Sequence, residues 1–171
     1  MIYSKQVNKA CNVMYDAHKD DIDKGGYPYV FHPFYLATQM DDEDSICVAL
    51  LHDVIEDHGD IYSFETLNKM GFNSNIINAL KLLTHDENVP YMEYVQKIKT
   101  NPLARKVKIA DLKHNLDTTR TGNYPRKYGL YKEALAYLEN EWYKWGQVRW
   151  VNTKNYGNIY QPYLIILMIQ K

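Results

Sequence analysis

The stretch ICVALLHDVIED, residues 46–57, decides the fold. Its first six residues are all apolar, which is typical of a helix that is buried on every side. Ionisable side chains follow close behind them: His52, Asp53, Glu56 and Asp57. Burying such groups is costly unless they are paired or bound to a metal. The stretch therefore predicts a central helix, over about residues 43–57, that carries a functional site.

Helical spacing continues on both sides of this stretch, and the alternation typical of strands is almost absent. Ser4 is a suitable N-cap for a first helix that ends near Lys19. The glycines and proline of DKGGYPY (23–29) interrupt the pattern, and Pro33 suits the first turn of a helix over about 33–40. Further helices are predicted at about 62–70, 74–83, 90–99, 102–118, 126–146 and 160–169. The sequence thus predicts an all-α bundle of about eight to ten helices.

Length and charge narrow the class of partner. At 171 residues and a formal net charge of −1, the chain is expected to form one domain over residues 1–171. It lacks the positive field that a long nucleic acid or an anionic membrane needs, but a small anionic substrate stays open. The N-terminus has no secretory signal, and the apolar run LIILMI (164–169) is too short to span a bilayer.

Two further features of composition bear on the class. Cys11 and Cys47 form no paired motif, as expected of reduced thiols, so we expect a soluble cytoplasmic protein. The 16 tyrosines favour a core with hydrated edges, ahead of ring platforms for a base. If the apolar tail is exposed, it offers a face for a homodimer.

Four side chains suit a divalent metal. His52 and Asp53 are adjacent, so they reach one ion only when it lies over the seam between their two directions. A six-coordinate ion needs more ligands, and the best candidates are His32, directly before Pro33, and Asp111, among apolar neighbours. Two imidazoles and two carboxylates suit Mn²⁺, Fe²⁺, Zn²⁺, Co²⁺ or Ni²⁺.

Polar neighbours of these ligands indicate what the site does. Glu56 and Asp57 lie one turn beyond Asp53, where a water-activating base is needed. A polar stripe accompanies Asp111 on the predicted 102–118 helix: Lys108, His114, Asn115 and Thr118. The same acidic side chains could instead form a structural ion-pair network with Lys108 or Arg105. His114 could orient a carboxylate, and His58 and His85 are expected at the surface.

Four segments, in this order, resemble the HD-domain hydrolases: YPYVFHP (27–33), ALLHDVIED (49–57), the LT of KLLTH (81–85) and VKIADLKHNLDTTR (107–120). The similarity is to the branch that contains the hydrolase domain of the RelA/SpoT enzymes and the small alarmone hydrolases. It covers about residues 8–120, and the predicted helices over 126–171 lie beyond it. The Glu-Asp pair directly after HDVI is typical of this branch.

The resemblance implies a compact HD-domain bundle and Mn²⁺-dependent removal of the 3′-pyrophosphate from ppGpp or pppGpp. By position, the metal ligands are His32, His52, Asp53 and Asp111. The catalytic acidic pair is Glu56 and Asp57. The positions that line the nucleotide pocket are Lys24, Asn115 and Thr118. His18, at the end of the first helix, stands where this family often has a histidine, or it is a helix-end charge.

Two positions depart from the family pattern. Asp23 stands where an Arg that stacks on guanine is usual, and Leu112 replaces an Arg that follows the metal-binding Asp. An Asp offers no cationic face and repels phosphate. Two alternatives therefore stay open: an HD phosphatase for another nucleotide or a phosphorylated cofactor, and an HD protein that senses a nucleotide without cleaving it.

Overall fold

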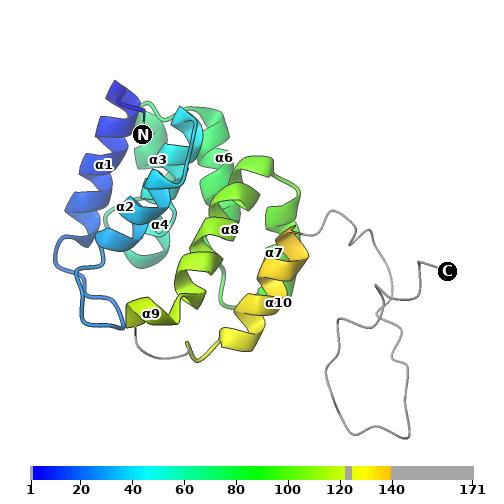
Figure 1. Cartoon of the computed structure of the whole chain (residues 1–171). Helices are drawn as coiled ribbons and strands as arrows, with labels where there is room; N and C mark the ends of the chain where they lie inside the picture. The colour runs from blue at the N-terminus through cyan, green and yellow to red at the C-terminus, as the bar shows by residue number, and fades with distance from the viewer. Residues whose placement is uncertain (1, 122–124, 140–171) are drawn as a thin grey trace, which may run out of the picture.

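The computed structural model describes residues 2–121 and 125–139, which form an all-α bundle without β-strands (Figure 1). The helices are α1 (Lys5–His18), α2 (Phe31–Thr38), α3 (Glu43–Leu51), α4 (Val54–Asp57), α5 (Phe64–Lys69), α6 (Ser74–Leu83), α7 (Tyr91–Lys99), α8 (Pro102–Leu116), α9 (Thr118–Thr121) and α10 (Tyr128–Glu139). The predicted fold class is confirmed. The predicted helix at 160–169 and the end of the one at 126–146 lie outside the described residues.

Helix α3 forms the centre of the bundle, as its apolar sequence predicted. Every residue from Ser45 to Leu51 is buried, and the helix packs against α1, α2, α6 and α8. Helix α8 also packs against α7 and α10, so it lies between the central helix α3 and that pair (Figure 1). Cys47 is buried in this core, where burial raises the pKa of its thiol to about 12, and it forms no disulfide.

The predicted continuous helix over 43–57 is wrong. Helix α3 ends at Leu51, and α4 begins at Val54 after a turn through His52 and Asp53. Asp53 has φ −101° and ψ −7°, in the right-handed helical region but away from the values of a regular α-helix. The turn moves the Asp53 side chain away from the position that a regular helix would give it. As a result, adjacent His52 and Asp53 face the same point.

Other helix boundaries shift by a few residues. Ser4 caps α1 as predicted, since its hydroxyl accepts a hydrogen bond from the Val7 amide at 3.1 Å. Helix α2 begins two residues before Pro33, which places His32 in its first turn. The predicted 102–118 helix ends at Leu116, because Asp117 takes an extended conformation, and Thr118 starts α9. Every helix in the described ranges is too short or too polar to cross a lipid bilayer.

Asp42 caps the central helix and also binds a neighbouring cation. Its carboxylate accepts hydrogen bonds from the Ser45 amide at 2.8 Å, the Ser45 hydroxyl at 2.6 Å and Lys106 at 2.9 Å. Partial burial acts to raise the pKa of Asp42, but these donors and the charge of Lys106 hold it well below its usual value. The carboxylate therefore stabilises the fold only while it is ionised.

We expect Asp42→Ala to lower the free energy of unfolding by about 1 kcal/mol at neutral pH, because α3 loses its cap. Since the folded-state pKa is depressed, the difference from wild type is complete above about pH 4 and shrinks as the pH falls further. Urea unfolding at a series of pH values measures it. Asp41→Ala is the matched control, because exposed Asp41 contacts Lys106 without capping the helix. Equal losses in both variants would contradict the capping role.

Candidate metal centre

Three separate segments bring the four predicted ligands together. His32 comes from the first turn of α2, His52 and Asp53 from the turn between α3 and α4, and Asp111 from α8. His32 Nε2 lies 3.3 Å from His52 Nε2 and 3.2 Å from Asp111 Oδ1. Asp53 Oδ2 lies 2.9 Å from His52 Nε2 and 3.9 Å from His32 Nε2. His52 Nε2 lies 4.0 Å from Asp111 Oδ1. The side chains predicted from the sequence therefore form one cluster.

These separations suit a single divalent ion. An octahedral ion about 2.1 Å from each ligand atom keeps neighbouring ligands about 3.0 Å apart and opposite ligands about 4.2 Å apart. The five separations given above span 2.9 to 4.0 Å. His32, His52 and Asp53 each place a ligand atom within 4.8 Å of the other two, and Asp111 stands outside this group of three and approaches it through His32 and His52. His32, His52 and Asp111 are buried, whereas the side chain of Asp53 keeps 23% of its surface exposed and faces solvent. The residues present fit a metal with open coordination positions for water or substrate.

Hydrogen bonds fix the direction of both imidazoles. The Nδ1 atom of His52 lies 2.9 Å from the Ala49 carbonyl and donates to it, so Nε2 faces the cluster. His32 Nδ1 lies 2.6 Å from His114 Nδ1, which likewise directs His32 Nε2 to the cluster. Burial acts to lower the pKa of His52, but the carboxylates of Asp53 and Asp111 raise it to about 9. The two carboxylates therefore favour a positive charge beside His52, and either a proton or a metal ion would supply it.

Asp111 is held at both of its oxygens. Lys108 Nζ lies 2.8 Å from Oδ2, and the Asn115 amide donates to Oδ1 at 2.5 Å. Burial acts to raise the pKa of Asp111, but Lys108 and the two histidines hold it far below its usual value. The sequence also allowed a structural ion pair of these acidic side chains with Lys108 or Arg105. The pair with Lys108 is present beside the ligand cluster. Arg105 takes no part in it and donates to the Leu138 carbonyl at 2.6 Å.

Two residues that support the cluster were not assigned this role from the sequence. The Tyr29 hydroxyl donates a hydrogen bond to Asp53 Oδ2, and its ring packs against His32. Tyr29 lies three residues before His32 in the segment YPYVFHP (27–33), and this spacing was the sequence feature that could have indicated its role. His114, which could have oriented a carboxylate, contacts His32 and stacks on Tyr35, with ring centroids 4.3 Å apart.

The predicted catalytic pair lies on α4, one turn after Asp53. Both side chains are exposed, and Glu56 Oε2 accepts a hydrogen bond from the His85 amide at 2.9 Å. Glu56 therefore connects the segment after α6 to α4, next to the turn through His52 and Asp53. Although the side chain of Asp57 is exposed, the protein atoms close to its carboxylate reduce its hydration. This desolvation, followed by the charges of Asp53 and Glu56, raises the pKa of Asp57 to about 6. A carboxylate with such a pKa can accept and release a proton near neutral pH.

A cavity of about 320 Å³ opens beside His32. It is lined by Asp23, Tyr27, Phe31, His32, Tyr35 and His114. Asp23 Oδ1 accepts hydrogen bonds from the amides of Gly25 and Tyr27, at 2.8 and 3.0 Å, and so closes the loop before α2. The departure from the family pattern at this position therefore has a structural use. The lining of the cavity thus combines polar side chains with aromatic rings.

The predicted nucleotide-contacting residues are placed differently from one another. Asn115 is directed at Asp111, while Lys24 is exposed on the loop and does not line the cavity. Thr118 is half-buried at the start of α9. Leu112, the second departure, is buried in the core with 1% of its surface exposed. The structure thus brings the four ligands together but does not gather the three predicted substrate contacts around the cavity.

No family model matches the chain. Among solved structures, it is similar to a metazoan ortholog of SpoT, described as hydrolysing ppGpp and playing a role in starvation responses. The two share 23% sequence identity with a TM-score of 0.63, over 81% of this chain and 87% of that one. Identity at this level shows the fold. The chain therefore shares the all-α fold of that SpoT ortholog, in agreement with the fold class predicted from its motifs.

Proposed function

We propose that the protein is a metal-dependent phosphohydrolase that removes the 3′-pyrophosphate from ppGpp or pppGpp. The observation that carries this proposal is the convergence of His32, His52, Asp53 and Asp111, with Asp57 one turn away. A divalent ion at this position, for which we propose Mn²⁺, would polarise a phosphoryl oxygen and lower the pKa of a water molecule. The SpoT ortholog that shares the fold is described as a ppGpp hydrolase, which supports the same reaction.

The chain's own residues then have separate tasks. Asp57, with its raised pKa, is suited to take the proton from the attacking water and to release it afterwards. Glu56 holds the segment that follows α6, through the His85 amide. Lys108 and Asn115 keep Asp111 in place, and Tyr29 does the same for Asp53. The carboxylate ligands are thus fixed before substrate binds, which favours catalysis because little reorganisation is needed.

The cavity beside His32 suits a nucleotide base. Three of the lining rings are largely exposed: Tyr27, Phe31 and Tyr35, at 57%, 62% and 47%. Stacking of a base on such rings contributes about 1–3 kcal/mol. The carboxylate of Asp23 lines the same cavity in place of a cation, and this favours a second candidate, hydrolysis of another nucleotide or phosphorylated cofactor. The reaction would then be the same, with a different substrate.

The test is pyrophosphate release from ppGpp by the purified protein with Mn²⁺. We expect Asp57→Asn to lower kcat by about 10²–10⁴-fold, because the general base is lost. Asp60→Asn, an exposed position three residues further along the chain, is the matched control and should keep wild-type activity. If the wild-type protein hydrolyses ppGpp no faster than Asp57→Asn does, ppGpp is ruled out as the substrate. A panel of nucleotides separates the candidates, since preference for one without a 3′-phosphate favours the second. Tight binding without turnover would indicate a nucleotide sensor.

Phe31 provides a separate test of base stacking. Its ring lines the cavity, and we expect Phe31→Ala to raise KM for the nucleotide by about 5–100-fold, with a smaller effect on kcat. Phe34→Ala is the control, because Phe34 is on the same helix and 46% exposed but does not line the cavity. Steady-state kinetics of both variants measure the difference. A similar KM in both would place the base elsewhere.

A further inference from the structure

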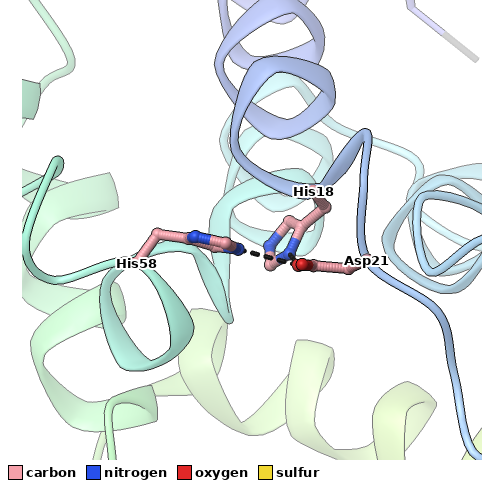
Figure 2. A group of neighbouring side chains, drawn as sticks. All are labelled: His18, Asp21 and His58. Atoms are coloured by element: carbon pink, nitrogen blue, oxygen red, sulfur yellow. Dashed lines mark hydrogen bonds and ion pairs between the residues drawn. The ribbon is translucent and has the colours of Figure 1, made fainter.

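A second group of metal-ligating side chains lies apart from the four ligands already described. It contains His18 at the end of α1, Asp21 in the following loop and His58 directly after α4. Asp21 Oδ2 lies 2.8 Å from His18 Nδ1 and 2.7 Å from His58 Nε2. Figure 2 shows both imidazoles converging on this one carboxylate oxygen. One ligand atom from each residue lies within 4.8 Å of the other two.

The backbone holds all three residues in place. The Asp21 amide donates to the His18 carbonyl at 3.1 Å, and the Asp21 carbonyl accepts from the Tyr29 amide at 3.0 Å. The His58 amide donates to the Val54 carbonyl at 3.0 Å, as the last bond of α4. His58 was expected at the surface, but only 20% of its side chain is exposed. The cluster is therefore built by three segments of the fold and is not a chance meeting of mobile surface groups.

His18 is the most deeply buried side chain of the three. Its side chain is 1% exposed, and its Nε2 atom is buried without a hydrogen-bond partner. A metal ion would bind Nδ1, the atom that contacts Asp21, and the proton of the neutral ring would stay on Nε2. A neutral imidazole is the form that binds metals.

We propose that His18, Asp21 and His58 form a second divalent-cation site, of the two-histidine, one-carboxylate type that Zn²⁺ occupies. Such a site keeps a coordination position for water, and here the side chain of Asp21 is 36% exposed, which gives access to solvent. A tetrahedral or octahedral ion about 2.1 Å from each atom needs ligands about 3.0–3.4 Å apart. The two nitrogen–oxygen separations would therefore widen by roughly half an ångström, a small movement for a carboxylate on a loop.

The position of this site gives it a structural task. An ion there would join the end of α1, the loop over residues 19–30 and the end of α4. The ring of Tyr29 packs on His18, with centroids 4.9 Å apart, and its hydroxyl donates to Asp53. The same loop carries Asp23, which lines the cavity. Occupation would thus hold the cavity loop and Asp53 in position, whatever reaction the first centre performs.

Metal stoichiometry tests the proposal on the full chain. The protein is stripped with a chelator, loaded with Zn²⁺, separated from free metal and analysed by mass spectrometry for bound ions. We expect about two ions per chain in wild type and about one in Asp21→Asn and in His58→Gln, because each removes a ligand. His58→Gln keeps a side-chain N–H that can donate to Asp21, so it preserves the hydrogen bond. Asp20→Asn, the same change at the exposed neighbouring position, should keep the wild-type stoichiometry.

A second measurement leaves the cluster unchanged. In His32→Gln, which disables the first centre, added Co²⁺ should give the visible absorption of an ion bound to nitrogen and oxygen ligands. This absorption should disappear when His58→Gln is added. A wild-type stoichiometry of one, undiminished binding in Asp21→Asn and His58→Gln, or no Co²⁺ spectrum in His32→Gln would each overturn the proposal. Loss of ppGpp hydrolysis alone bears only on the first centre.

Discussion

We expect Asp53→Asn to lower kcat/KM for the proposed nucleotide substrate by at least about 10³-fold, because a carboxylate of the proposed metal centre loses its charge. A bound ion contributes several kcal/mol of transition-state stabilisation, and each 1.4 kcal/mol corresponds to a tenfold change in rate. The substitution is close to isosteric, and the amide oxygen can still accept the hydrogen bond from Tyr29. The fold should therefore persist while the activity is lost.

Two further variants provide comparisons for the loss of activity in Asp53→Asn. Tyr29→Phe removes only the hydrogen bond to Asp53, and we expect it to weaken metal affinity by about 10–100-fold, which excess Mn²⁺ can compensate. Asp60→Asn removes a carboxylate that has no part in the centre and should match wild type. Titration of activity with Mn²⁺ measures all three. Wild-type activity in Asp53→Asn at limiting Mn²⁺ would exclude Asp53 as a ligand.

Lys108→Met lowers the free energy of unfolding of the metal-free protein by about 3–5 kcal/mol, because it leaves the buried carboxylate of Asp111 without its cation. The Lys108 side chain is only 14% exposed, and burial alone would lower its pKa. The charge of Asp111 instead raises that pKa well above the usual value. The pair is therefore fully charged in the folded state, and removing one partner leaves a buried charge.

Two controls separate this charge effect from the loss of a side chain. Lys106→Met changes the same residue type on the same helix, but Lys106 is 37% exposed and pairs with the exposed Asp41 and Asp42, so we expect about 1 kcal/mol or less. Replacing both partners, Lys108→Met with Asp111→Leu, should recover much of the stability. Chemical unfolding in the presence of a chelator measures each variant. Equal losses for Lys108→Met and Lys106→Met would contradict the prediction.

The central helix and the side chains proposed as metal ligands could be selected from the sequence because both leave a local signal. The unbroken apolar run of 46–51 indicated burial, and α3 is indeed the centre of the bundle. Ionisable residues close to that run, and Asp111 among apolar neighbours, indicated a buried polar site, and three of the four ligands are buried. Ser4, with helical spacing after it, indicated the start of α1.

The break between α3 and α4 could not be predicted in this way. The residues around His52 and Asp53 have no glycine or proline, so local propensity favours a continuous helix. The turn depends on partners from elsewhere in the chain, among them Tyr29, which donates to Asp53, and His32, which faces His52. These partners come together only in the folded chain, so local spacing carries no signal of the break.

By itself, the sequence determined the all-α class, the central buried helix and the side chains His32, His52, Asp53 and Asp111 as a candidate metal centre. Tertiary structure alone decided how those ligands are held and what stands beside them. His114 meets His32 across 82 positions of sequence, and His58 meets Asp21 across 37. Hydrophobic periodicity reports which face of a helix is buried, because burial follows from local spacing. Directional contacts between distant polar groups depend on how the helices pack, and no local pattern records that.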